Sequence, residues 1–478
     1  MRAFFLYNIV DLNRTEKTMA NYRKRKRKQK KAAKTFFVVV LIILLVAAAL
    51  ALYQYFTKST INPLGTLHYT GIDEEDYVPQ SKAEPNRRVS VNIDDGGSAY
   101  DVGVSDAEAA VINEYFEKYY VSLGRFVPED ISNLFTEEAI YQRSLCSSEI
   151  YYLCGVRDIM SVDLGYDMCD VGLKYLSVTN TEEGLRKIDL VVNDYMSYDY
   201  IPDVTSYTCD VEHTFIFDGD LISEHSEISG AYSHLKEAYD KFAEDGGFDK
   251  DEFSEEQADG IFKSICDDLI DGAMTDIKKA ESAKKRFNDA PDKFTVKKSA
   301  DHAYDAVAAL DYSYEWTGQY EKKRNSAYAE YDNLGGNCNN FISQCLHAGG
   351  IPMDTSGDIH VQWKWYSSGL DASQTASGRS MSWTGVEEFY DYCLSNKGFG
   401  LSCETGCNLY SGRPGDILQY VSGDRGVHSV IITKVIYDGG GNVVDYLINS
   451  NTTDKVDCPT MTYGYTNLRL IRIVGWND

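Results

Sequence analysis

Residues 324–353 read RNSAYAEYDNLGGNCNNFISQCLHAGGIPM, and this stretch decides the fold of the C-terminal third of the chain. After the turn at Gly335-Gly336-Asn337, apolar residues recur with helical spacing from Cys338 until Gly349-Gly350 ends the predicted helix. Cys338 is thus the first residue of a predicted helix. Free backbone N–H groups and the positive end of the helix dipole stabilise a thiolate there, so we expect a lowered pKa. The same N–H groups can stabilise an oxyanion, which makes Cys338 our candidate nucleophile.

A base for this thiol lies on the strands predicted downstream. The strand VHSVIITKVIYD carries His428 near its start, Gly439-Gly440-Gly441 predicts a hairpin turn, and the returning strand VVDYLINSNTTD carries Asn449 and Asn451 on one face. His428 would deprotonate the cysteine and then protonate the leaving amine. Asn451, with Asn449 as the alternative, would hold the imidazole tautomer. This chemistry requires no metal and no cofactor.

The run CNNFISQCLHAGGIP, from Cys338 to Pro352, resembles the signature of an amidase-domain family of Gram-positive bacteria. That family has a papain-like fold related to the NlpC-type and CHAP cell-wall hydrolases. The Pro414-Gly415-Asp416 turn before His428 matches in order, as do the three tryptophans Trp363, Trp365 and Trp383. The resemblance covers residues 321–478. It implies a cysteine amidase or peptidase that cuts amide bonds of peptidoglycan or a related peptide, with Cys338, His428 and Asn451 as the catalytic residues.

Two positions depart from the family pattern. Asn337 stands where an Asp usually precedes the cysteine, and Asn451 stands where the third residue is often His. Because Asn can still accept the imidazole N–H, we expect activity to survive. A catalytically inert cell-surface binding or scaffold protein is the alternative. Hydrolysis and acyl transfer would use the same residues and remain open.

The three tryptophans are candidate substrate-binding residues. Trp363, Trp365 and Trp383 would line a groove for a glycan or a peptide. Core packing is the alternative, because Trp is bulky and usually mostly buried. Cys345, one heptad after Cys338, is expected to pack in the core.

The N-terminal end differs in charge from the rest of the chain. Residues 1–35 hold twelve Lys and Arg against two acidic residues, a charge of +10 within a total of −26 over 478 residues. Residues 36–56 read FFVVVLIILLVAAALALYQYF, which is long enough to span a bilayer core. We therefore expect a basic cytoplasmic tail and a single-pass transmembrane helix, with the C-terminal part extracellular. The alternative is secretion after signal-peptide cleavage. Met1 and Met19 are both candidate start residues.

Composition divides the middle of the chain into three parts. Residues 57–104 are rich in Gly, Pro, Asp, Glu and Ser and predict a flexible linker. Residues 105–232 predict helices followed by alternating strands, an α+β domain of unknown role. The order of its elements resembles the cone-shaped nuclear-transport-factor-type fold. Residues 233–320 predict a charged helical spacer, opened by a capping box at Ser254–Gln257.

Some residues and properties carry less functional information. His213 and His225 lie on predicted strands of the 105–232 domain and are assigned no chemistry, and the protein partner of that domain is unknown. The acidity excludes nucleic acid as a partner, because phosphate binding needs a basic surface. Eleven cysteines are an odd number, so at least one thiol is unpaired or pairs between chains.

Overall fold

The computed structural model describes residues 77–478, except 229, 247–252, 333, 366–377 and 465. The predicted basic tail 1–35 and apolar segment 36–56 lie outside the described residues. Within the described part of the chain, no helix is both long enough and apolar enough to cross a membrane. The longest one carries charged residues along its whole length. The prediction of a single-pass membrane protein with an extracellular C-terminal part is therefore corrected.

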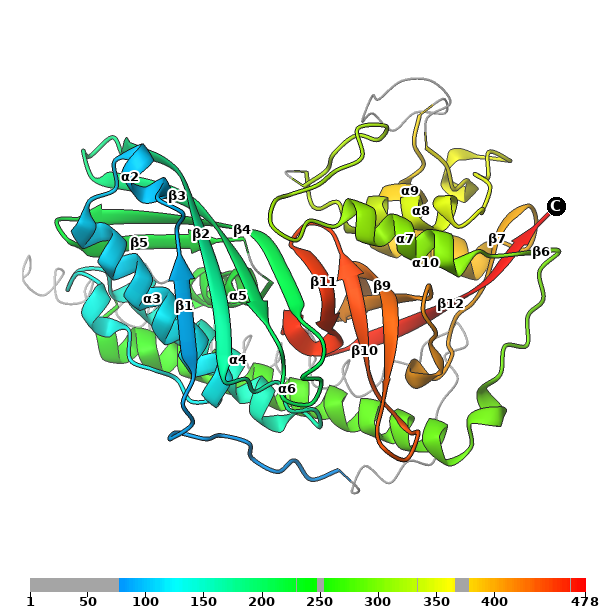
Figure 1. The fold of residues 1–478 in the computed structure, drawn as a ribbon, viewed down its shortest axis with the longest axis horizontal. Coiled ribbons are helices and arrows are strands. Elements are labelled where there is room, and N and C mark those ends of the chain that lie inside the picture. The colour runs from blue at the N-terminus through cyan, green and yellow to red at the C-terminus, as the bar shows by residue number, and fades with distance from the viewer. Residues whose placement is uncertain (1–76, 229, 247–252, 333, 366–377, 465) are drawn as a thin grey trace, which may run out of the picture. The chain divides into compact units, whose positions relative to one another are not determined.

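The fold is a mixed α+β arrangement built on one large sheet (Figure 1). The strand order is β1-β2-β3-β4-β11-β10-β9-β8-β12-β6, with β5 beside β4 and β7 beside β12. The β1–β2 pair is parallel and the other pairs are antiparallel. The strands are β1 Ser90–Asp94, β2 Met168–Asn180, β3 Arg186–Met196, β4 Ser206–Asp218, β5 Leu221–Glu227, β6 His302–Ala303, β7 Gly400–Glu404, β8 Ile417–Ser422, β9 Arg425–Tyr437, β10 Val443–Ser450, β11 Asp454–Pro459 and β12 Leu468–Asn477.

The helices begin and end where local signals place them. The predicted capping box is found: Ser254 and Gln257 exchange side-chain and backbone hydrogen bonds. Ser105 and Glu108 form a second capping box at the start of α3. The helices are α2 Ser98–Val102, α3 Asp106–Arg125, α4 Ile140–Ile159, α5 Gly230–Gly246, α6 Glu255–Asp289, α7 Ala306–Trp316, α8 Cys338–Ala348, α9 Met381–Thr384 and α10 Val386–Ser395.

The first half of the described chain consists of helices α3 and α4 packed on the meander β2–β5. This is the predicted order of helices followed by antiparallel strands. The linker predicted from composition over residues 57–104, however, includes residues that are not linker. Residues 90–94 form β1 and pair with β2. The strand is short and its side chains are only partly buried, so it has no apolar run that the sequence could reveal.

The C-terminal strands separate two apolar cores. Ile417, Ile431 and Ile471 face one core, which includes helix α8, while their neighbours Leu418, Ile432 and Leu470 face the other. This follows from the alternation of side chains along a strand. Helices α7 to α10 gather on the first face (Figure 1). Helix α6 contributes Ala280, Ala283 and Phe287 to the second.

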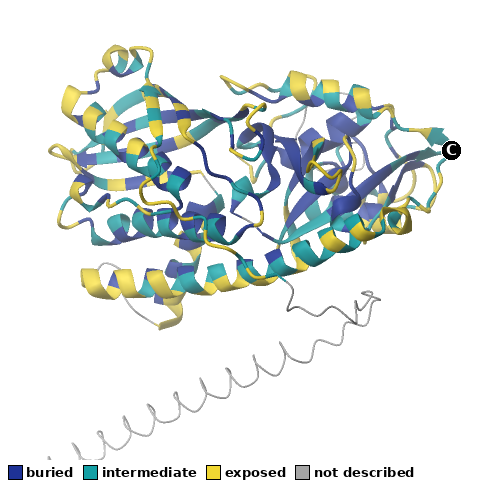
Figure 2. Cartoon of the chain, turned by 60° about the horizontal axis from the view of Figure 1, so that its bottom comes forward, coloured by how far each residue is buried: buried dark blue, intermediate teal, exposed yellow. Residues whose placement is uncertain are grey.

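The sheet continues from the N-terminal half into the C-terminal half. Strand β4 pairs with β11, with Cys209 opposite Asp454. Helix α6 reinforces this connection, because Phe262 and Ile277 belong to the core of the first half while Phe287 packs against the second. Figure 2 shows α6 with one exposed face and one face turned to the protein. The charged helical segment therefore packs along both halves.

Candidate active site

Cys338 is the first residue of α8, as predicted, and its side chain is buried, with 5% of the residue exposed. Backbone N–H groups of Ser429, Asn339 and Cys338 itself stabilise the thiolate. Burial outweighs them and raises the pKa of Cys338 above its usual range. The expectation of a lowered pKa is therefore wrong for this geometry, because the helix start is buried inside the protein. The thiol is protonated at neutral pH.

His428 lies near the start of β9, directly before Ser429. It pairs across the sheet with Tyr420 of β8, and its ring lies 5.9 Å from that of Tyr420 and 4.7 Å from that of Tyr463. Burial, with a smaller contribution from the positive charge of Lys455, lowers the pKa of His428 to about 3. The Nε2 atom is buried and makes no hydrogen bond with the described residues. The imidazole is therefore neutral at rest.

The structure places the Cys338 thiol against the backbone amide of Ser429, the residue that follows His428. Among the described residues, no hydrogen bond joins the Cys338 thiol to the His428 imidazole. Ser429 points toward α8, so the side chain of its neighbour His428 points toward the other face of the sheet. Tyr463 interacts with both, by ring contact with His428 and electrostatically with Cys338. The alternation of β9 explains why sequence order alone did not reveal this separation.

A buried polar chain fixes the start of α8 against β9. Ser429 Oγ donates to Asn339 Oδ1 at 2.9 Å, and Gln419 Nε2 donates to Ser429 Oγ at 3.1 Å. Arg469 Nε in turn donates to Gln419 Oε1 at 2.8 Å. Asn339 also donates to the carbonyls of residues 382 and 383 at 3.2 Å. Sequence reasoning missed these residues, although polar side chains inside an apolar helix and strand are a usable signal.

Asn451 is placed on the cysteine loop and not on the imidazole. Its Oδ1 accepts from Asn337 Nδ2 at 3.1 Å, and its Nδ2 donates to the carbonyl of Trp316 at 3.1 Å. The backbone N–H of Asn337 donates to Thr452 Oγ1 at 2.8 Å. The turn after β10 thus holds the residue before Cys338. The predicted role of Asn451 as the orienter of His428 has no support in this geometry.

Asn449, the alternative orienter of His428, also makes its side-chain hydrogen bonds to other residues. Its Nδ2 donates to Ser313 Oγ at 3.1 Å, and its Oδ1 accepts from the backbone N–H of Asp457 at 2.9 Å. It lies opposite Ile431 in the β9–β10 pair, on the face that carries α7 and α8. His428 points to the other face, so the two side chains are separated by the sheet itself.

The three tryptophans belong to the core. Trp363 and Trp383 are fully buried, Trp365 is buried, and the rings of Trp363 and Trp383 pack 4.8 Å apart. Trp363 Nε1 donates to Ser343 Oγ at 3.1 Å and Trp383 Nε1 donates to Asn340 Oδ1 at 3.0 Å. The predicted groove lined by these residues is corrected: they pack on α8 and hold its position.

All eleven cysteines are free thiols, and Cys407 is the only one that is not buried. Cys345 packs in the core with Phe341 and Leu346, as expected. The structure also brings together a set that the sequence analysis set aside: His213, His225 and Glu227 on the β4–β5 hairpin. The sequence contained a signal for this set, because two histidines and a glutamate flank the Asp218-Gly219-Asp220 turn at positions that alternate along the two strands.

Comparison with known proteins identifies the C-terminal part of the chain. Residues 303–474 match the family described as "Putative amidase domain". The uncharacterized protein YhbB of Bacillus subtilis (strain 168) is 34% identical over 154 residues, which are 32% of this chain and 42% of that protein. The chain therefore matches less than half the length of this relative. No solved structure matches the chain. The family indicated by the Cys338 motif is confirmed for residues 303–474, the part of the chain that matches the amidase-domain family.

Proposed function

We propose that the amidase domain hydrolyses amide bonds, with Cys338 as the nucleophile and His428 as the general base. The observation that carries this proposal is the position of the Cys338 thiol against the backbone amide of Ser429, the residue next to His428. Helix α8, with a cysteine at its start, packed on an antiparallel strand that carries a histidine, supports a papain-like fold. Helices α3 and α4 on an antiparallel meander support a nuclear-transport-factor-type fold for the 105–232 part.

The proposed reaction begins with thiol and imidazole both neutral. His428 leaves its contact with Tyr463 and accepts the Sγ proton while Sγ forms a bond to the amide carbonyl carbon. The carbonyl electron pair moves to oxygen, and the free N–H groups at the start of α8 stabilise that oxyanion. When the C–N bond breaks, His428 donates its proton to the leaving nitrogen. Water then attacks the thioester, giving the acid and restoring the thiol.

In this scheme the His428 ring must move from the Tyr463 face of β9 to the face that carries α8. Its buried Nε2 atom makes no hydrogen bond with the described residues, so none of those has to break there. Catalytic hydrogen bonds are often long or absent in ligand-free structures and form when substrate binds. In this scheme Asn451 acts on the position of Cys338 and not on that of His428. It holds Asn337, and through it the backbone that carries Cys338.

Peptidoglycan is the first substrate to test, because the resemblance to cell-wall hydrolases concerns its amide bonds. Purified peptidoglycan is incubated with the protein, and the released fragments are identified by mass spectrometry. New amino and carboxyl ends would name the bond that is cut. A parallel digest of synthetic peptides with free and amidated ends separates a general peptidase from an enzyme that needs the muramoyl–peptide linkage. Release that is equal for wild type and Cys338→Ala would refute the proposal.

An inert scaffold is the second candidate, and a specific observation favours it. No hydrogen bond joins Cys338 to His428 among the described residues, and burial keeps the thiol protonated. Iodoacetamide labelling in the presence and absence of a substrate peptide separates the two candidates. An enzyme of the proposed kind labels slowly alone and changes its rate at Cys338 when the peptide binds. An inert domain labels at one unchanged rate.

A further inference from the structure

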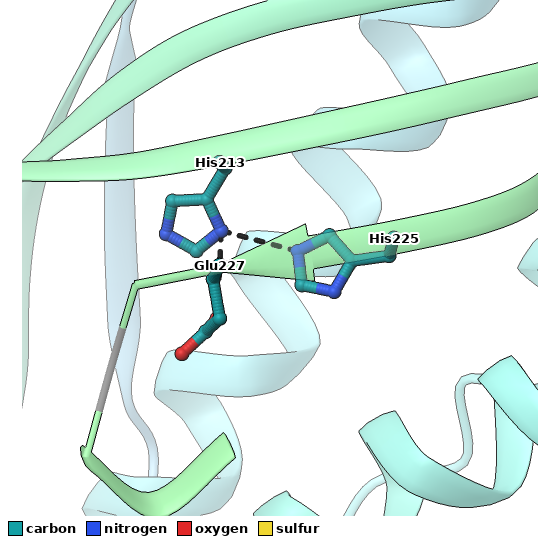
Figure 3. Close-up of side chains that lie close together, drawn as sticks. All are labelled: His213, His225 and Glu227. Carbon is teal, nitrogen blue, oxygen red and sulfur yellow. Dashed lines mark hydrogen bonds and ion pairs between the residues drawn. The ribbon is translucent and has the colours of Figure 1, made fainter. Parts of the chain in front are cut away.

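The β4–β5 hairpin carries three side chains of metal-binding types whose potential ligand atoms lie close together. His213 Nδ1 lies 3.1 Å from His225 Nε2 and 3.4 Å from Glu227 Oε2 (Figure 3). The donor atoms of the three residues all lie within 4.8 Å of one another. Four ligands placed about 2.0–2.1 Å from a tetrahedral Zn²⁺ are separated by about 3.3 Å. The observed separations therefore suit a single ion between these atoms.

The hairpin register produces this arrangement. Glu227 is directly opposite His213, and His225 is opposite Phe215, two residues along β4. All three side chains therefore project from the same face of the sheet, because side chains alternate along each strand. Tyr115 and Phe116 of α3 and Cys146 of α4 contact the two histidines on that face, and all three ligand residues are buried. The ligands thus come from two strands whose spacing the sheet fixes.

The second nitrogen of His225 also has a partner, in this case a thiol. Cys146 Sγ of α4 lies 3.3 Å from His225 Nδ1. A hydrogen bond at Nδ1 leaves Nε2 free as the ligand atom and fixes the orientation of the ring, as second partners do in known metal sites. Phe116 packs on His213 at 5.1 Å, and Phe215 packs on His225 at 4.5 Å. These rings exclude water and strengthen electrostatic interactions at the site.

The charge around the cluster favours a cation. His213 and Glu227 border a cavity of about 120 Å³. The cavity wall carries two basic residues, Arg157 and Lys455, and three acidic residues, Glu149, Asp194 and Glu227. Metal binds to the neutral form of an imidazole.

From this geometry we propose that His213, His225 and Glu227 bind one divalent first-row transition-metal ion, with Zn²⁺ as the probe, whose open coordination position faces the cavity. Two imidazoles and a carboxylate exclude Mg²⁺ and Ca²⁺ as the preferred ions and are the set found with an open position in zinc and non-haem iron sites. The proposal does not depend on the activity of the amidase domain. It assigns a role to the 105–232 part, which the amidase reaction does not explain.

The test is metal binding by the untagged full-length protein. The protein is stripped with a chelator and dialysed against Zn²⁺, and bound metal is counted by inductively coupled plasma mass spectrometry. We expect one equivalent for wild type and for the control His360→Ala, which removes an exposed imidazole. We expect none for His213→Ala with His225→Ala. Circular dichroism confirms that the double variant is folded, and the milder Glu227→Gln is expected to weaken binding at least tenfold without unfolding the protein.

Cobalt substitution identifies the ligands. Co²⁺ bound by two imidazoles and a carboxylate gives visible d–d bands without the intense ultraviolet thiolate-to-cobalt band. These bands are expected to remain in Cys338→Ser and to disappear in the double histidine variant. Zn²⁺ is also expected to raise the melting temperature of wild type and not that of the double variant. The proposal is overturned if stripped wild type binds no Zn²⁺, or if the bound metal persists in the folded double variant.

Discussion

Ser429 Oγ donates a hydrogen bond to Asn339 Oδ1 at 2.9 Å, and these two residues are the chain neighbours of His428 and Cys338. One buried hydrogen bond thus joins the start of α8 to β9 beside both proposed catalytic residues. Gln419 and Arg469 extend the chain to the strands β8 and β12. Because these polar groups are buried, the loss of one partner leaves others unpaired. The backbone positions of both catalytic residues therefore depend on the whole hydrogen-bond network.

Replacing Ser429 with Ala leaves Asn339 Oδ1 and Gln419 Nε2 short of a partner in the core. We expect a loss of roughly 1–3 kcal/mol in unfolding free energy. We also expect kcat to fall on the order of 10–100-fold with little change in KM, because small displacements of reacting groups are costly. Denaturant unfolding and steady-state kinetics measure the two effects. Ser395→Ala, which removes an exposed hydroxyl on α10, is the matched control. Unchanged kcat in Ser429→Ala would remove the positioning role.

The pH profile of the reaction follows from the two buried groups. His428 must be neutral to accept the proton, and burial lowers its pKa to about 3, so protonation stops the reaction only toward that value. The pKa of Cys338 is raised, so thiol ionisation begins above its usual range. We therefore expect kcat/KM to stay flat between about pH 5 and pH 8, with no acidic limb near 6.5, the ordinary pKa of His. Intrinsic fluorescence over the same range shows that the protein stays folded. An acidic limb near 6.5 would contradict a buried, neutral His428.

Asn451 is expected to act on the cysteine loop and not on the imidazole. Asn451→Ala and Asn337→Ala should each lower kcat about tenfold, and the double variant should show a coupling energy of roughly 0.5–3 kcal/mol. Loss of a true imidazole orienter would instead cost on the order of 10⁴-fold. Asn449→Ala is the control, because its partners are Ser313 and Asp457. Additive effects of the Asn451 and Asn337 changes would show that their hydrogen bond does not matter.

The tryptophans are expected to affect stability and not substrate binding. Trp383→Phe removes the donor to Asn340, and Trp363→Ala empties a fully buried site. We expect the alanine variant to lose about 3–5 kcal/mol and the phenylalanine variant less. KM of the folded Trp383→Phe protein should match that of wild type. A large rise in KM without loss of stability would restore the groove interpretation.

Local patterns in the sequence predicted most of the elements. The helix that starts at Cys338, the Gly439–Gly441 hairpin and the capping box at Ser254 follow from short-range signals, and the structure contains each of them. The β4–β11 pairing joins residues more than 200 positions apart, and no local pattern specifies it. Propensity and spacing report neighbours along the chain, whereas strand pairing between distant segments depends on the packed core.

The candidate site shows the same limit at the level of side chains. The sequence placed Cys338 and His428 on the correct elements, but it could not give the face to which His428 points. That face depends on the register of β9 with β8, where His428 pairs with Tyr420. The hydrogen bond between Asn451 and Asn337 depends on how the turn after β10 packs against the cysteine loop. From the sequence, Asn451 was the predicted orienter and Asn449 stayed open as the alternative.

Trapping the covalent intermediate tests the central claim most directly. The full chain is mixed with its substrate, quenched in acid during turnover, digested and analysed by mass spectrometry. The thioester is expected on the peptide that contains Cys338, and Cys338→Ala should lose both adduct and activity. Cys407→Ala, which changes the one cysteine that is not buried, should keep both. Turnover by Cys338→Ala at the wild-type rate would contradict the assignment of Cys338 as the nucleophile.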